Sequence, residues 1–252
     1  MHVHLPKPLH GWREFAGEVG IIVVGVLIAL GAQQVVEAVH DRADTNDARA
    51  EINAEVVTDI TRINQRALAD QCVVSRLAEI DGIIDAADAD GKINRPSWIG
   101  RPPLYGIESA RWDAASQSGR ISRLPSDWQG EFGFLYTALK RFSYVNDAEQ
   151  QVWSRLEALA GVDRLTPDGK LAIKADIAEA RYLNFQVRQI SNAIFLTAAR
   201  QGLRPTNRRD PPFGTCWPIS TPTAQGQAMV AARSTSRWLE FVRTHNSNVP
   251  WH

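Results

Sequence analysis

The feature that most constrains this chain is a run of 18 residues without a charge, residues 19–36, bounded by Glu18 and Glu37. As a helix, this run spans about 27 Å, which is close to the thickness of the hydrocarbon core of a bilayer. A core helix of a water-soluble domain normally keeps a polar stripe, and residues 19–32 have none. The run therefore predicts a transmembrane helix.

A cleavable signal peptide is the alternative interpretation of this segment. Lys7 and Arg13 would form its positively charged region, and residues 29–31 would form a small-residue cleavage site. We favour a retained anchor because the apolar run is longer than that of a usual signal peptide. The helical pattern also continues without a break through Val39.

The orientation of the span depends on a balanced charge count. Two basic residues lie on each side of the span within about 20 residues, so the positive-inside rule alone does not decide. The free amino terminus and three nearby histidines favour an amino terminus in the cytoplasm. We therefore expect residues 1–18 to be a short cytoplasmic tail and the domain after the span to lie outside the cytoplasm.

Small residues recur on one side of the predicted span. From Glu18, steps of seven, four and three lead to Gly25, Ala29 and Ala32, and Gln33 continues the same helix face. Small side chains allow a second transmembrane helix to approach closely, and Gln33 could hydrogen-bond across such a contact. This face is a candidate surface for helix association, although glycine and alanine are also common in membrane spans.

The positions of glycine and proline predict long helices in the rest of the chain. Neither residue occurs in residues 32–81, 134–160, 170–201 or 227–249. Such gaps, bounded by helix breakers, argue against a β-rich or alternating α/β protein. The sequence predicts an all-α fold, in which the single transmembrane helix continues into a stalk helix and an up-and-down helical bundle packs on the stalk.

This fold divides the chain into the tail, the span over residues 19–36, the stalk over residues 37–90 and the bundle over residues 91–252. Apolar residues at helical spacing from Ile52 to Ile84, including Ala67 and Val74, form the stripe by which the stalk would contact the bundle. The stalk could be continuous with the span or resume after a short kink.

Local signals predict the ends of the remaining helices. The expected features are a short helix over residues 107–118 and a long helix opened by a capping box of Ser126 and Gln129, with a kink or a division into two helices at Asn146 and Asp147. A further helix is expected from Thr166 and Pro167 to Gly202, and a last helix over residues 223–243. The proline-rich residues 203–222 predict an irregular strap laid over the bundle.

The two cysteines of the chain, Cys72 in the stalk and Cys216 in the strap, lie 144 residues apart. If the domain faces an oxidising compartment, a disulfide between them could hold the strap to the stalk. The alternative is a pair of buried free thiols that act as small hydrophobic side chains. We favour the disulfide on the condition that the domain is exported.

Patterns that indicate catalysis or cofactor binding are absent from the sequence. The six histidines form no HxxxH or HExxH pair, and no GxSxG, Walker or GxGxxG pattern occurs. The 28 basic and 28 acidic residues balance, which gives no indication of a nucleic-acid partner. We therefore expect a protein that is not an enzyme and that has no cofactor, no metal and no nucleic-acid partner.

Two segments resemble features of an uncharacterised bacterial family of single-pass membrane proteins. The first is residues 17–30, in which a Gly-Glu pair precedes an apolar run that ends in Leu-Ile-Ala-Leu; the second is Gln-Ser-Gly-Arg-Ile at residues 117–121, ahead of a long helix. The resemblance implies a bacterial membrane anchor with a helical extracytoplasmic domain, and we expect this anchor in the inner membrane, with the domain in the periplasm. It implies no activity.

These observations favour a membrane-anchored helical scaffold or accessory protein of a bacterial membrane assembly. Its expected partners are the lipid bilayer and either further copies of itself or other membrane proteins. The alternative is an extracytoplasmic small-molecule sensor or binding module, because helical bundles can hold ligands between their helices.

Overall fold

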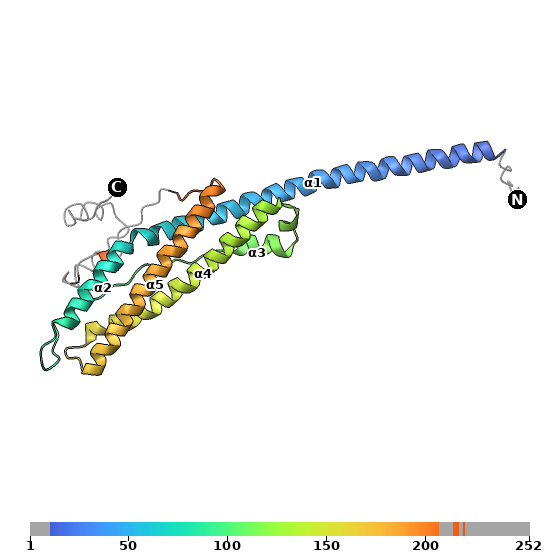
Figure 1. Ribbon diagram of the computed structural model, residues 1–252. Coiled ribbons are helices and arrows are strands. Elements are labelled where there is room, and N and C mark those ends of the chain that lie inside the picture. Colours follow the sequence, from blue (N-terminus) through green and yellow to red (C-terminus); the bar gives the residue numbers. More distant parts are fainter. Residues whose placement is uncertain (1–10, 207–213, 217–218, 220–252) are drawn as a thin grey trace.

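The computed structural model describes residues 11–206, 214–216 and 219 (Figure 1). The helices are α1 (Trp12–Leu68), α2 (Asp70–Asp85), α3 (Ala110–Gln117), α4 (Ser126–Glu157) and α5 (Pro167–Arg200), with short 3₁₀ turns η1 (Ile121–Arg123), η2 (Ala158–Gly161) and η3 (Gly214–Cys216). The described residues contain no β-strand, although an isolated bridge joins Lys92 to Arg164. The predicted all-α fold is confirmed.

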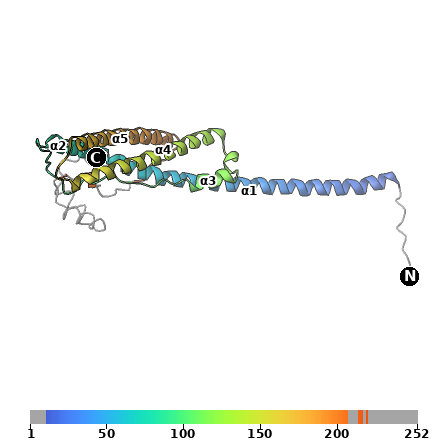
Figure 2. The same ribbon diagram turned by 90° about the horizontal axis from the view of Figure 1, so that it is seen from below.

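The long helix α1 projects from the bundle over its amino-terminal half and packs in the bundle over the rest (Figure 1). Helices α2 and α4 both run away from the amino-terminal end, and α5 runs back antiparallel to α4. Residues 86–109, which contain no helix, make the return from α2 to α3. Figure 2 shows α4 and α5 alongside the carboxyl-terminal part of α1.

The core lies between the inward faces of α1, α2, α4 and α5. Each helix contributes aliphatic or aromatic side chains at helical spacing, so that one face of each is buried. Fully buried examples are Ile60 of α1, Leu77 of α2, Phe142 of α4 and Ile194 of α5. The buried apolar faces therefore hold the bundle together.

One residue, Ala69, separates α1 from α2, and the helix axis changes direction there (Figure 1). The buried face passes from Arg66 through Ala69 to Val73, all of them fully buried. The stripe predicted through Ala67 to Val74 is wrong in this part, because Val74 is 46% exposed. A pattern of apolar residues misses the buried position 66, because a charged residue, Arg66, occupies it.

The predicted ends of α5 are confirmed. Pro167 is its first residue, and the Thr166 hydroxyl accepts a hydrogen bond from the backbone N–H of Gly169. Proline is well suited to the first turn because its missing N–H has no partner there in any helix. Gly202, with φ 72°, follows the last turn in the left-handed conformation that favours glycine.

Predictions about α4 need two corrections. Ser126 is already helical and does not cap the helix; the cap position belongs to Pro125, and the Gln129 side-chain amide donates instead to the Leu124 carbonyl. Asn146 does not divide the helix, because α4 is continuous from Ser126 to Glu157. Asn146 is fully buried and hydrogen-bonded, which explains why a polar residue lies in the middle of a long helix.

The short helix α3 begins at Ala110, three residues later than predicted. The predicted last helix over residues 223–243 lies outside the described residues, as does most of the strap, of which residues 203–206, 214–216 and 219 are described.

Candidate functional site

The apolar part of α1 is exposed throughout. This helix is long and apolar enough to cross a membrane, and none of its most apolar 18-residue window is buried in the fold. Ile21 is 76% exposed and Val36 is 68% exposed. Removing one such side chain from water is worth about 1.5–3 kcal/mol, so a run of them favours an apolar surrounding strongly.

The bundle meets α1 directly after this apolar segment. Arg123 of η1 forms an ion pair with Asp41 of α1 at 2.5 Å, and Ala48 is the first core residue of α1. Only one helical turn, about 6 Å of rise, separates Glu37 from Asp41. If residues 19–36 cross a bilayer, the end of the bundle that carries η1 would lie beside the membrane surface.

The predicted association face lies on this projecting part of α1. Glu18, Gly25, Ala29, Ala32 and Gln33 are all exposed. The Gln33 side-chain amide donates to the Glu37 carboxylate of the same helix at 2.9 Å. The face is therefore open to another helix.

Cys72 of α2 and Cys216 of η3 form a disulfide, with their Cα atoms 4.6 Å apart. Of the site residues predicted from the sequence, these are the distant ones that the structure brings together. The bond joins segments 144 residues apart and ties η3 to α2. Disulfides of this kind persist in oxidising compartments and are rare in the cytosol.

Two buried carboxylates of α1, which the sequence analysis did not single out, hold the start of α3. Glu55 accepts hydrogen bonds from the backbone N–H groups of Arg111 at 2.8 Å and Trp112 at 3.4 Å. It also accepts one from the Tyr136 hydroxyl of α4 at 2.6 Å. Because Ser109 supplies no side-chain cap, Glu55 caps α3 from another helix, where a negative charge also favours the helix dipole.

Asp59, one turn after Glu55, is fully buried and hydrogen-bonds to the segment that leads into α3. Its carboxylate accepts the backbone N–H of Glu108 at 3.1 Å and lies 3.4 Å from the Arg62 guanidinium. Burial raises the pKa of Asp59 to about 7, although the Glu108 hydrogen bond and the Arg62 charge oppose this shift. Burial, and then the hydrogen bond to Glu55, also raise the pKa of Tyr136 above its usual range.

Replacing Asp59 by asparagine is expected to remove a pH-dependent term from stability. The pKa of Asp59 is near 4 in the unfolded chain and about 7 in the folded protein. Between about pH 4 and pH 7 the folded protein therefore holds a proton on Asp59 that the unfolded chain releases, so the contribution of Asp59 to stability falls as the pH rises. Asparagine keeps an acceptor for Glu108 and never charges. The free energy of unfolding of Asp59→Asn minus that of the wild type should increase between pH 4.5 and pH 7, by at most about 1.4 kcal/mol per pH unit.

Urea denaturation of both proteins in detergent across this pH range measures the difference. Asp113→Asn is a suitable control, because Asp113 is exposed and bonds the neighbouring Ser109 hydroxyl. A difference between Asp59→Asn and the wild type that stays constant with pH would contradict the proton linkage.

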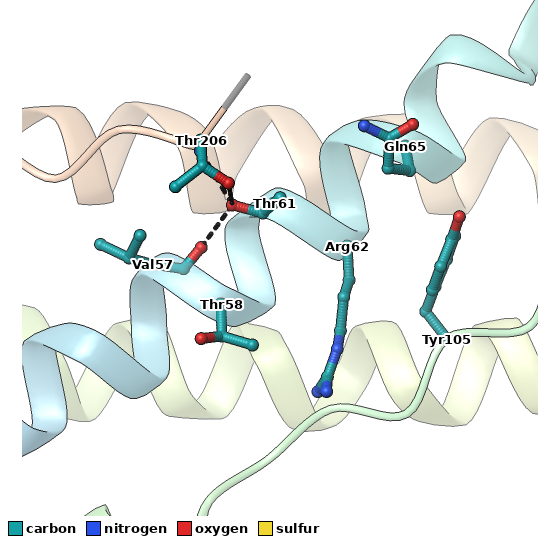
Figure 3. Close-up of a pocket in the computed structure, with 7 residues that line it drawn as sticks. All are labelled: Val57, Thr58, Thr61, Arg62, Gln65, Tyr105 and Thr206. Atoms are coloured by element: carbon teal, nitrogen blue, oxygen red, sulfur yellow. Dashed lines mark hydrogen bonds between the residues drawn. The ribbon is translucent and has the colours of Figure 1, made fainter. Parts of the chain in front are cut away.

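A pocket of about 410 Å³ lies beside α1 (Figure 3). It is lined by Val57, Thr58, Thr61, Arg62, Gln65, Tyr105 and Thr206. The Thr61 hydroxyl donates to the Val57 carbonyl and accepts the backbone N–H of Thr206 at 2.9 Å. The pocket is thus built from one helix and from two segments far away in the sequence.

The charge of Arg62 at this pocket is already engaged. Its guanidinium donates to the Gly106 carbonyl at 3.0 Å and forms an ion pair with Glu108 at 2.7 Å. The remaining polar groups of the pocket are mainly hydroxyl and amide groups beside apolar surface, which suit an uncharged small molecule better than an anion.

A charged network crosses the core and joins four helices. Arg66 of α1 donates to both carboxylate oxygens of Glu149 of α4, at 3.1 and 2.5 Å, and to the Asn184 side chain of α5 at 2.7 Å. Asn184 in turn donates to Asp70 of α2 at 2.8 Å, and Asn146 donates to Glu149. We call these residues the Arg66 network. The fully buried ion pair at its centre joins α1 to α4, and the hydrogen bond from Arg66 to Asn184 joins α1 to α5.

The seven-residue gap in the apolar stripe between Ala67 and Val74 was the one sequence signal for this network.

Comparison with known proteins adds no further residue roles: no protein-family model, no curated protein and no solved structure matches this chain. What the protein does has to be inferred from its own residues.

Proposed function

We propose that this protein is a membrane-anchored helical scaffold or accessory protein of a bacterial membrane assembly, without enzymatic activity. The observation that carries the proposal is the continuity of α1. One helix of 57 residues holds an exposed apolar span at its start and a face of the bundle core at its end. Such a helix holds the bundle at a constant height and tilt above the span.

In this proposal residues 1–18 are cytoplasmic, residues 19–36 cross the inner membrane, residues 37–90 form the stalk, and the bundle of residues 91–252 is periplasmic. The disulfide between Cys72 and Cys216 supports this side, because the cytosol would keep both thiols reduced. The ion pair of Asp41 with Arg123 supports a bundle that lies close to the membrane surface.

The proposed partners are the lipid bilayer, further copies of this chain and other membrane proteins. The exposed face of Glu18, Gly25, Ala29, Ala32 and Gln33 would serve contacts within the membrane. The absence of enzymatic activity is consistent with the use of the buried carboxylates: Glu55 and Asp59 hold backbone N–H groups, and Glu149 holds Arg66. The alternative function is small-molecule binding in the bundle, for which the pocket beside Thr61 and Arg62 is the candidate site.

Full-length protein expressed in a bacterium should remain in the membrane pellet after alkaline carbonate washing. A matched variant, Val24→Arg with Leu27→Arg, puts two charges at the centre of the span, each of which opposes insertion by about 2.5–3.5 kcal/mol. We expect this variant to leave the pellet or to be degraded.

Protease added to spheroplasts should digest the bundle of the wild type, which tests the periplasmic side.

Amino-terminal sequencing of the mature protein separates the anchor from the signal peptide. An intact amino terminus in the washed pellet supports the anchor. Soluble protein that begins near residue 30 would contradict it, and a bundle that protease reaches only after cell lysis would overturn the orientation.

A further inference from the structure

The outer face of α5 carries a second stripe, opposite the face that is buried in the core. Alternating steps of four and three residues lead from Leu171 to Ala199, and all nine positions reached are exposed and uncharged. The large apolar side chains among them are Leu171, Tyr182, Phe185 and Leu196, which are 71, 59, 44 and 66% exposed. Three further alanines and the amides of Gln189 and Asn192 complete the set, which we call the α5 stripe.

This composition is unusual for a helix face in water. The exposed face of the neighbouring α4 also carries aromatic residues, Phe134 and Tyr144, but they alternate with the charged Lys140, Arg141 and Asp147. The steps of four and three on α5 average 3.5 residues, which is the repeat by which one helix packs along another in a coiled coil. Over 29 residues the stripe covers about four heptads, enough for a stable seam.

The charged residues beside the stripe are held by the protein's own bundle. On one side, Lys174 forms ion pairs with Asp81 and Asp85 of α2, and Arg181 pairs with Asp81 at 2.7 Å. On the other side, Glu179 pairs with Arg155 of α4 at 2.6 Å. Arg188 lies over the ring of Phe185, with its guanidinium carbon 5.6 Å from the ring centroid, and its guanidinium is 3.8 Å from the Asp70 carboxylate of α2. A docked helix therefore meets an uncharged stripe that is flanked at Phe185 by the Arg188 guanidinium. Figures 1 and 2 both place α5 on the outside of the bundle, where such a helix has access.

We propose that the α5 stripe pairs in parallel with the α5 stripe of a second copy of this chain. The two amides favour the parallel arrangement over an antiparallel pair centred on Phe185. In a parallel pair, Gln189 faces Gln189 and Asn192 faces Asn192 of the partner, so that each amide can donate to and accept from its counterpart. In an antiparallel pair centred on Phe185, the amides would face Tyr182 and Ala178, and Asn192 would be buried against a methyl group.

Membrane anchoring favours the same arrangement. Two chains anchored in one bilayer through α1 hold their α5 helices at the same height and in the same direction, at a high effective concentration. This argument for the parallel direction rests on the proposed membrane anchoring, whereas the exposure of the α5 stripe does not.

Cysteine crosslinking of the full-length protein in native membranes tests the pairing. In a parallel pair each stripe residue faces its own counterpart, so Ala178→Cys and Ala199→Cys should each give a covalent dimer on mild oxidation. Thr137→Cys, on the exposed face of α4, is the control and should stay monomeric. Phe185→Glu combined with Ala178→Cys should reduce the dimer at least tenfold, whereas Phe185→Leu should retain it.

Phe185 is partly exposed and points away from the core, so circular dichroism should show the same helicity for Phe185→Glu as for the wild type. Crosslinking only between co-expressed Ala178→Cys and Asn192→Cys would replace the parallel arrangement by an antiparallel one. Membrane-bound protein without any crosslink, or with a crosslink to a different protein, would overturn self-pairing and leave the anchor intact. A dimer released by carbonate would support the pairing and contradict the anchor.

Discussion

Replacing Glu149 by leucine is expected to lower the free energy of unfolding by about 3–5 kcal/mol. Glu149 accepts two hydrogen bonds from Arg66, and both side chains are fully buried. Without Glu149 the guanidinium remains in the core with its charge uncompensated, which is the costly state of a buried ion pair. Urea denaturation of the full-length protein in detergent, followed by circular dichroism, measures the loss.

A double-mutant cycle separates the charge from the packing. Arg66→Met combined with Glu149→Leu replaces the pair by apolar side chains, so its loss should be clearly smaller than the sum of the two single losses. Arg155→Met is the control, because Arg155 forms exposed ion pairs with Asp176 and Glu179, worth about 1 kcal/mol or less. If Glu149→Leu were as mild as Arg155→Met, the Arg66 network would not hold the helices in place.

Removing the disulfide is expected to have the second large effect. Because Cys72 and Cys216 lie 144 residues apart, the closed loop restricts the unfolded chain strongly, and the chain-entropy model gives about 5 kcal/mol as an upper value. Cys72→Ser with Cys216→Ser should therefore unfold at a lower temperature and at a lower urea concentration than the wild type.

Addition of a reductant provides the matching measurement. The wild type should shift toward the stability of the double serine variant, and the variant itself should not respond. A wild type whose unfolding is unchanged by complete reduction would show that the bond contributes little. Thiol labelling of the unfolded protein, isolated from bacterial membranes, should find both cysteines protected before reduction.

The parts of the fold that the sequence predicted are those that neighbouring residues decide. The uncharged run of residues 19–36, the gaps without glycine or proline and the Thr166 cap each act within a few turns of one helix. Their physical consequences, namely apolar length, helix continuity and satisfied N–H groups, can be evaluated without knowing any distant partner. The disulfide stayed conditional because it depends on which distant segments meet.

The buried charges could not be predicted in this way. The stripe through Ala67 and Val74 assumed that buried positions are apolar, whereas Arg66 is buried because Glu149 lies opposite. The same holds for Glu55 and Asp59, whose burial depends on the start of α3.

The sequence by itself therefore determined that this is an all-α chain with one apolar helix long enough to cross a membrane. Only the tertiary structure decided that the helix bends at Ala69, that Arg66 is buried and that the uncharged outer face of α5 is exposed. The reason is that a charge enters a core only beside a partner, and the partners of Arg66 lie 83 and 118 residues further along the chain.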